Sequence, residues 1–270
     1  MNILHISDIH FRKSYNQFEM GYKGMIWKMD NPLRQLKICL DHVKEKMTIG
    51  LLLISGDLTE DGGVEDYAYL KEWLSQEIGD IPIVVTLGNH DIKPNFRVGW
   101  LNEAPSNQPY NIVKTFDEFH VISFDNSVYE RSDGSMTDSQ FSWLEEQLKE
   151  FQDKPIVLMT HHHLLEGQSS TPILPESNRL IKMISEYPAV LCLLNGHTHH
   201  VYNGDIGGIQ YYTVGGMSFV GEDEGEGQVR FEQRFGYNTY QTNKGEIKQQ
   251  TSENFITGKI IARVNMMEEN

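Results

Sequence analysis

The chain has 270 residues, of which 39% are hydrophobic and 23% are charged, and its formal net charge at pH 7 is −15. This composition is typical of a folded globular protein, and the length fits one α/β domain spanning 1–270. The negative charge disfavours binding to long DNA or RNA, because it would repel the phosphate backbone. It does not exclude short oligonucleotides or small phosphorylated substrates.

No part of the sequence indicates a membrane segment. No window approaches the roughly 20 apolar residues that a membrane-spanning helix needs. The first residues, MNILHISDIH, carry neither a basic leader nor a long apolar run. Cys39 and Cys192 lie in apolar stretches and are expected to be buried thiols rather than a disulfide. We therefore expect a cytoplasmic protein without a membrane partner, and the sequence leaves the oligomeric state open.

Short aliphatic runs alternate with patterns of helical spacing along most of the chain. The runs suit strands buried on both faces, and the alternation favours an α/β sandwich. Thr137 and Gln140 have the spacing of a capping box at the start of one helix. Strands are predicted, in chain order, over residues 2–6, 51–55, 83–87, 121–124, 156–160, 190–194 and 210–214. Helices are predicted between them, over residues 33–47, 67–78, 141–151 and 180–187.

The segments outside this alternation have a different character. Residues 11–30 and 92–111 are predicted to be long loops, and both follow polar motifs, so they could wall a substrate site. The acidic stretch GEDEGEGQ at 221–228 is expected to be a solvated loop. Alternating stretches such as GKIIARV indicate hairpins, and we expect residues 200–270 to complete a second sheet.

Five of the predicted strands are followed directly by polar residues. In an open α/β sheet the carboxyl ends of the strands meet in one crevice, where binding sites form. Each motif alone is weak, but packing does not explain why so many apolar strands deliver histidine, aspartate or asparagine to this edge. The motifs are Asp8-Ile9-His10, Asp57, Asn89-His90-Asp91, His161-His162-His163 and His197-Thr198-His199.

These residue types indicate metal binding. Imidazole suits Zn, Fe or Mn, and carboxylates suit harder divalent ions. The set offers more ligands than one ion needs, and it fits two ions that share a carboxylate and activate water between them. Asp57, alone in its motif, is the natural shared ligand. The Asp-x-His and His-x-His spacings would place both side chains of each pair on the same side of an extended segment.

In this order, the motifs D-x-H, GD, GNHD, a histidine after an apolar strand, and GHTH resemble those of the calcineurin-like metallophosphoesterase superfamily. Within it, HISDIHFR, GNHD and LMTHHH are most similar to the bacterial cyclic-nucleotide and glycerophosphodiester phosphodiesterase branch. Many relatives in that branch have HHPP where this chain has His162-His163-Leu164-Leu165, and the motifs end at His199.

The resemblance implies a four-layer αββα sandwich with two central mixed sheets and a dinuclear metal site at the carboxyl ends of the strands. It also implies that the site holds two metal ions (Mn, Fe or Zn) and that their two sets of ligands have Asp57 in common. The first set would be Asp8, His10, Asp57 and His199, and the second would be Asp57, Asn89, His161 and His197.

The same resemblance implies that His90 is catalytic and contacts the phosphate or the leaving group, and that Asp91 orients it. A hydroxide between the ions would attack phosphorus in a small phosphodiester. The alternatives are a phosphomonoesterase or protein phosphatase, although protein phosphatases usually have glutamate at the position of Asp91, and a catalytically silent interaction scaffold.

Several neighbours of the motifs are weaker candidates. His162 and His163 could support the ligands or face the substrate, and Arg12 could contact phosphate but is more often a surface residue. The aromatic residues of the first long loop, such as Tyr22, are expected to pack over the sheet. The pair Asp125-Asn126, at the end of another predicted strand, is expected to be structural.

Overall fold

The protein, described here as a computed structural model of residues 1–18 and 20–268, is built on two six-stranded mixed sheets. The first sheet has the order β10-β11-β1-β2-β3, and β12 pairs with the opposite edge of the long strand β11. Its strands are β1 (Asn2–Ile6), β2 (Leu51–Ser55), β3 (Ile83–Thr86), β10 (Val220–Gly225), β11 (Gln228–Asn243) and β12 (Glu246–Asn265).

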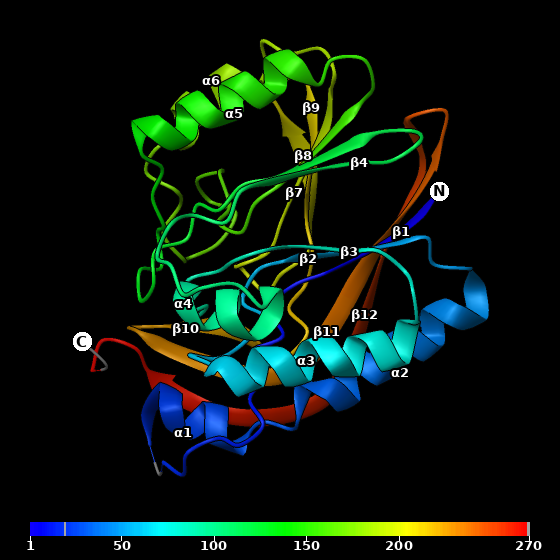
Figure 1. Ribbon diagram of the computed structural model, residues 1–270. Helices are drawn as coiled ribbons and strands as arrows, with labels where there is room; N and C mark the ends of the chain where they lie inside the picture. The colour runs from blue at the N-terminus through cyan, green and yellow to red at the C-terminus, as the bar shows by residue number, and fades with distance from the viewer. Residues whose placement is uncertain (19, 269–270) are drawn as a thin grey trace.

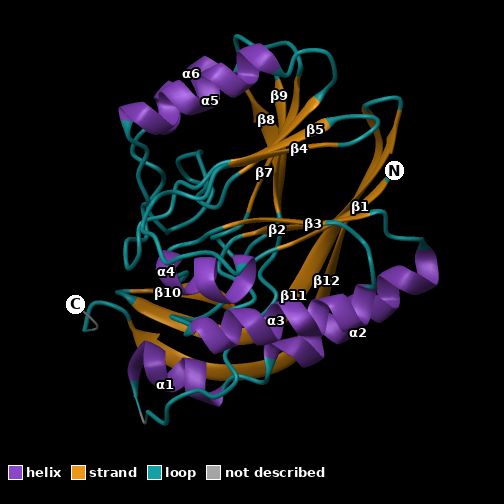
Figure 2. Cartoon of the chain, in the orientation of Figure 1, coloured by secondary structure: helices purple, strands orange, loops and turns teal. Residues whose placement is uncertain are grey.

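The second sheet has the order β4-β5-β6-β7-β9-β8. Strands β1, β2 and β3 run parallel, as do β5, β6, β7 and β9, so their carboxyl ends lie at one side of the molecule, where Figure 2 shows the loops gathered. Its strands are β4 (Ile112–Thr115), β5 (His120–Ser123), β6 (Ile156–Met159), β7 (Val190–Asn195), β8 (Tyr202–Ile206) and β9 (Ile209–Thr213).

Helices cover the outer faces of both sheets. Figure 1 shows α5 and α6 over the second sheet and α2 and α3 over the first, with α1 beside the β11–β12 hairpin. Buried aliphatic side chains such as Leu53 and Val157 fill the space between the sheets, and two further apolar cores lie under the helices. The predicted αββα sandwich is confirmed. The helices are α1 (Gly21–Lys28), α2 (Pro32–Lys46), α3 (Val64–Ile78), α4 (Lys93–Phe96), the π-helical turn η1 (Arg97–Leu101), α5 (Asp138–Glu150) and α6 (Ser177–Ile184).

Local signals at the helix starts explain why the main helices match their predicted ranges. Pro32 occupies the first turn of α2, and the side chain of Asn31 accepts a hydrogen bond from the Leu33 amide. The predicted capping box of α5 is present, since Thr137 and Gln140 each accept a hydrogen bond from the backbone amide of the other.

The C-terminal part differs from the prediction. Only β8 and β9 complete the second sheet, whereas β10, β11 and β12 extend the first. The acidic stretch 221–228 is not a loop but forms most of β10 and the turn into β11. Its carboxylates can lie on strands because arginines of the neighbouring strands face them: Glu224 Oε1 lies 3.0 Å from Arg230 Nη1, and its Oε2 lies 2.8 Å from Arg263 Nε.

The two predicted long loops also contain helical structure. Helix α1 lies within 11–30, and α4 with η1 lies within 92–111. The apolar side chains of α1, Met25 and Ile26, are buried against Phe219, Phe231 and Val264, so the helix is stabilised by contacts from the far end of the chain rather than by a local pattern. Among the described residues, no helix is both long enough and apolar enough to span a membrane.

Candidate metal centre

The loops that follow β1, β2, β3, β6 and β7 carry the seven predicted ligand residues. Six of their side chains are buried, and that of His199 is 11% exposed. This burial is unusual for a set of carboxylates and imidazoles, which pair with ions or hydrogen-bond partners when they leave water. The residues are Asp8, His10, Asp57, Asn89, His161, His197 and His199.

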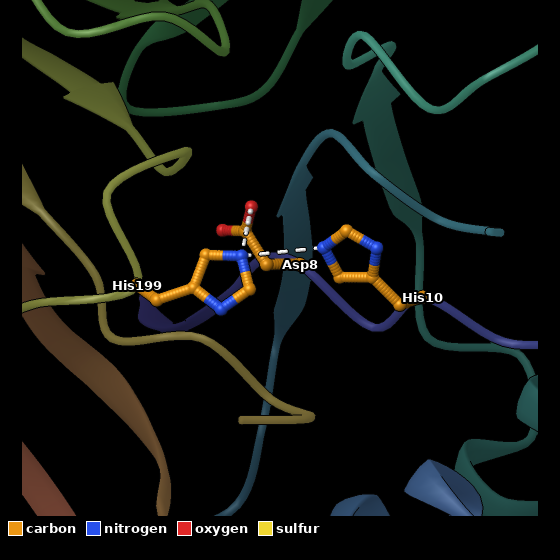
Figure 3. A group of neighbouring side chains, drawn as sticks. All are labelled: Asp8, His10 and His199. Carbon is orange, nitrogen blue, oxygen red and sulfur yellow. Dashed lines mark hydrogen bonds and ion pairs between the residues drawn. The ribbon is translucent and has the colours of Figure 1, made fainter. Parts of the chain in front are cut away.

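Within the predicted ligand set, Asp8, His10 and His199 form the first of two groups. One ligand atom from each lies within 4.8 Å of the others. Asp8 Oδ1 lies 3.3 Å from His199 Nε2, and the Nε2 atoms of His10 and His199 are 3.2 Å apart. Figure 3 shows the carboxylate of Asp8 and the two rings turned toward one point. One carboxylate and two imidazole side chains that face a common point can bind a divalent cation.

Asp57, His161 and His197 form the second group, again within 4.8 Å of one another. Asp57 joins the two groups: its Oδ2 lies 3.3 Å from His161 Nε2 and 3.6 Å from His10 Nε2. Its Oδ1 accepts a hydrogen bond of 2.8 Å from the His90 amide. One carboxylate oxygen therefore faces a histidine of each group, as a ligand shared between two ions must.

Several buried ligand atoms have no hydrogen-bond partner among the described residues, and this tests whether the site suits a cation. Buried polar atoms are nearly always paired, so a cluster of unpaired electron-pair donors is best explained by an ion. The ligand atoms that make no hydrogen bond are Asp8 Oδ1, Asn89 Oδ1, His161 Nε2 and His197 Nε2. The neighbours of Asp8 Oδ1 and His161 Nε2 at 3.3 Å are themselves proposed ligands, His199 and Asp57. A mixed oxygen and imidazole set of this kind fits Mn, Fe or Zn.

The other ring nitrogen of three histidines has a fixed partner. His161 Nδ1 lies 2.7 Å from the Ser55 carbonyl oxygen, and His199 Nδ1 lies 2.6 Å from that of Phe219. Each Nδ1–H donates to its carbonyl, which leaves the Nε2 lone pair pointing into the site. His10 Nδ1 lies 2.5 Å from Glu60 Oε2, a contact that sequence reasoning missed.

The backbone around the ligands is left-handed rather than extended. Asp8, His10, Asp57, His197 and His199 have φ angles of 55°, 50°, 47°, 70° and 58°. The expectation that each His- or Asp-containing pair lies on an extended segment is therefore wrong. Residues other than glycine in this region cost roughly 1–3 kcal/mol each, and such strain is typical of functional sites whose surroundings hold it in place.

Two glycines leave room for the ligands. A Cβ on Gly56, whose φ is +101°, would lie 2.3 Å from His161 Nδ1. A Cβ on Gly88 would lie 2.1 Å from Asp57 Oδ1. Glycine is thus required at both positions by the close approach of a side chain, which comes from the other sheet at Gly56 and from the neighbouring strand at Gly88.

The predicted role of Asp91 in orienting His90 is wrong. Asp91 is fully buried, and its carboxylate accepts hydrogen bonds from the backbone amides of Leu58, Thr59 and Gly88 and from the Tyr67 hydroxyl. Burial and then the charge of Asp57 raise the pKa of Asp91 to about 6. Asp91 therefore ties together the loops after β2 and β3 rather than contacting the His90 ring.

His90 faces two other carboxylates. Its Nδ1 lies 3.4 Å from Glu60 Oε1 and 3.5 Å from Asp61 Oδ1, and the Tyr22 ring stacks on it at a centroid distance of 6.0 Å. Burial lowers the pKa of His90, but Glu60 and Asp57 outweigh it and raise the pKa well above its usual value. Glu60 thus connects His90 with His10. In the sequence, Glu60 is distinguished only by being an acidic residue shortly after Asp57.

The weaker candidates lie in supporting positions. Asn126 Oδ1 accepts hydrogen bonds from the amides of His161 and His162, at 3.4 and 3.3 Å, so it holds the loop after β6. His162 and His163 are buried beside His197. Arg12 is bound to its own chain, because its Nε lies 3.0 Å from Asp66 Oδ2 and its Nη1 donates to the Glu60 carbonyl.

Two ligand groups joined by one carboxylate, at the strand ends of an αββα sandwich, define a class of protein: hydrolases of phosphate esters that use two metal ions. Comparison with known proteins agrees. The chain belongs to the calcineurin-like phosphoesterase family, whose model matches residues 1–201. It is therefore a metal-dependent phosphoester hydrolase, and membership of this family implies two metal ions.

The chain is similar to several curated bacterial proteins. It is 27% identical over 215 residues to a probable glycerophosphodiester phosphodiesterase of Arcobacter nitrofigilis, across 74% of this chain and 72% of that protein. It is 25% identical over 211 residues to the 3',5'-cyclic adenosine monophosphate phosphodiesterase of Escherichia coli, across 77% and 73%. These relatives fall in the branch that the motifs resemble.

Among solved structures, a dimetal phosphatase from Danio rerio has a TM-score of 0.59 and 13% sequence identity, covering 93% of this chain and 98% of that one. At this identity the likeness concerns the fold alone. It supports the two-sheet architecture described above.

Proposed function

We propose that this protein hydrolyses small phosphodiesters, of the cyclic-nucleotide or glycerophosphodiester type, with two metal ions that share Asp57. The observation that carries the proposal is the position of Asp57 Oδ2, which lies 3.6 Å from His10 Nε2 and 3.3 Å from His161 Nε2. The names of the curated relatives, which are glycerophosphodiester and cyclic-nucleotide phosphodiesterases, support the choice of a diester.

The proposed ligand sets follow the two groups. Asp8, His10, Asp57 and His199 would hold one ion, and Asp57, Asn89, His161 and His197 would hold the other. Bound ions supply Lewis acidity and a nucleophile at neutral pH, which is the chemistry that phosphodiester cleavage needs. Mn, Fe and Zn are the candidates, since the donor atoms mix oxygen with imidazole nitrogen.

In this proposal, His90 acts on the phosphate or on the leaving oxygen. Its Nδ1 faces Glu60 and Asp61, which favour the protonated ring, and a protonated imidazole can donate a proton to the departing alkoxide. Glu60 positions both His90 and His10. Asp91 holds the loops that carry Asp57 and Asn89, so its contribution is structural.

A substrate panel with one ligand variant tests the proposal. Bis(p-nitrophenyl) phosphate, 3',5'-cyclic AMP, glycerophosphocholine and a phosphopeptide would be assayed with Mn, Fe, Co and Zn. Wild type is expected to cleave diesters only with added metal. Asn89→Ala is expected to lose most turnover, because Asn89 Oδ1 is a buried, unpaired ligand atom. Turnover of the phosphopeptide alone would favour a monoesterase, and full activity of the metal-free protein would overturn the proposal.

The remaining expectations from the sequence stay predictions. They are a cytoplasmic location and the absence of long nucleic acid or a membrane as a partner. Binding of a labelled long duplex at physiological salt would contradict the expectation drawn from the net charge of −15.

A further inference from the structure

A cavity of about 500 Å³ is lined in part by Ile92 and Lys93, which belong to the same loop after β3 as Asn89 and His90. Four segments line it: residues 92–94 after β3, Asn107 and Pro109 before β4, residues 127–129 with Arg131 after β5, and Ser135, Thr137 and Gln140 around the start of α5. Its volume is within the range of roughly 300–1,000 Å³ that is typical of small-molecule sites.

The wall after β5 contacts the loop that carries Asn89, one of the proposed ligands. The Glu130 amide donates a hydrogen bond of 3.0 Å to the Asn89 carbonyl oxygen. Beside it, burial and the nearby carboxylates of Asp61 and Glu130 raise the pKa of the Tyr129 phenol. Asp61 Oδ1 in turn lies 3.5 Å from His90 Nδ1. Tyr129 and Asp61 therefore connect the cavity wall to His90, the residue proposed to act on the leaving group.

One buried carboxylate ties three of these walls together. Asp125 Oδ2 accepts hydrogen bonds from Lys93 Nζ at 2.6 Å and from the Tyr110 amide at 3.0 Å, and its Oδ1 accepts one from the Ser127 amide at 2.9 Å. Asp125 is only 1% exposed. The walls are thus held in place by the protein itself, which is the preorganisation that a binding site requires.

The lining suits an organic ring more than a charged group. Ile92, Pro94, Pro109 and Val128 present apolar surface. The two cationic lining residues are already paired, Lys93 with Asp125 and Arg131 with Asp133. Asn107 and Gln140 add amide groups that can hydrogen-bond to ring edges. If each heavy atom takes the share of about 30 Å³ that a water molecule has in the liquid, the cavity has room for on the order of 15 heavy atoms. A glycerol arm would leave most of that space empty.

We propose that this cavity binds the organic arm of the phosphodiester and selects a ring-bearing arm of nucleoside size over a small aliphatic arm. This inference rests on the proposed diesterase function. The residues that set the selection are those of the walls, Asn107 and Val128 above all, and Asp125 acts as a positioning residue through Lys93, Tyr110 and Ser127.

Calorimetric titration of the metal-loaded protein with adenosine 5'-monophosphate and glycerol 3-phosphate tests the inference. Both ligands carry the same phosphate group, so the difference in affinity reports the organic part. Wild type is expected to bind the nucleotide about tenfold more tightly or better, as burial of an aromatic ring predicts. Asn107→Trp, which fills the cavity from an exposed loop position, is expected to remove that preference.

Gln108→Trp is the matched control, because Gln108 is the exposed neighbour of Asn107 and lies outside the cavity lining that the described residues form. It should keep the wild-type preference. Val128→Ala provides a second variant that removes apolar wall without adding bulk, and it should weaken nucleotide binding while glycerol 3-phosphate binding stays the same.

Equal affinity for the two ligands in wild type, or an unchanged preference in both Asn107→Trp and Val128→Ala, would overturn the inference. The two proposals fail separately. A protein that prefers the nucleotide but cleaves no diester with any metal contradicts the diesterase proposal alone. A protein that cleaves diesters without a preference for the ring contradicts the assignment of the cavity alone.

Discussion

Asp57 Oδ2 lies 3.3 Å from Nε2 of His161, although the two residues come from different sheets. The same oxygen faces His10, so a single carboxylate from the loop after β2 connects the two ligand groups. The site therefore depends on both sheets, because each sheet supplies only part of the ligand set.

Replacement of Asp57 by Asn should remove the connection between the ligand groups. The side chain keeps its shape but loses the charge that would be shared by two cations, so we expect fewer than two ions per chain. Turnover should fall by on the order of a thousandfold, which corresponds to a loss of several kcal/mol of transition-state stabilisation. Metal content by mass spectrometry and turnover of bis(p-nitrophenyl) phosphate measure the two effects. Asp80→Asn, an exposed site, should change neither.

Glu60 should affect both metal binding and catalysis, since its carboxylate contacts His10 at 2.5 Å and His90 at 3.4 Å. Loss of a residue that supports a ligand typically weakens metal binding about 10–100-fold. We expect this for Glu60→Ala, with partial recovery in Glu60→Gln, which can still accept a hydrogen bond from His10. Competition with a coloured chelator gives the affinities. Unchanged affinity in both variants would show that His10 needs no such support.

Asp91 and His90 are adjacent but should behave differently. Asp91→Ala leaves several buried donors without an acceptor, and we expect a loss of roughly 2–4 kcal/mol in the free energy of unfolding. His90→Ala should leave stability nearly unchanged and reduce kcat by about 10²–10⁴-fold. Urea denaturation at fixed metal concentration and steady-state kinetics separate the two. The reverse pattern would restore the rejected role of Asp91 as a partner of His90.

Gly88→Ala should displace Asp57, because the added Cβ would lie 2.1 Å from Asp57 Oδ1. The φ angle of Gly88 is not among the positive values, so alanine adds bulk without backbone strain. We therefore expect weaker metal binding and lower turnover. Gly63→Ala, where the nearest atom would be 3.8 Å away, is the control and should bind metal normally. If both variants behaved like wild type, the packing of Asp57 against the loop after β3 would not matter for the site.

Most of the fold and the ligand set could be predicted because their signals are local. Apolar runs define the buried strands, and the proposed metal ligands follow shortly after these runs. The alternating stretch GKIIARV at 258–264 indicates one end of β12, but the full length of the strand and its place in the first sheet could not be predicted. Much of its surface is exposed, including Ile256 at 71%, so most of the strand lacks the alternation of a half-buried strand. Helix α1 is stabilised by partners at the other end of the chain.

The supporting residues of the site were missed for a related reason. Glu60 meets His10 across 50 positions of sequence, through left-handed turns at Asp57 and His10 that no local pattern reveals. Adjacency suggested that Asp91 orients His90, but the turn at Gly88 points the Asp91 carboxylate into the loop after β2. Asp125 and Asn126, by contrast, are expected to be structural from their place after a strand, and Asn126 does hold the histidine loop while Asp125 holds the cavity walls.

The most direct test of the two-metal account is a reconstitution titration of the metal-free protein with Mn, in which bound metal and turnover of bis(p-nitrophenyl) phosphate are measured together. The account predicts no turnover without metal and a rise that reaches its plateau at two ions per chain. Full turnover without metal, or a plateau at a single ion, would contradict it.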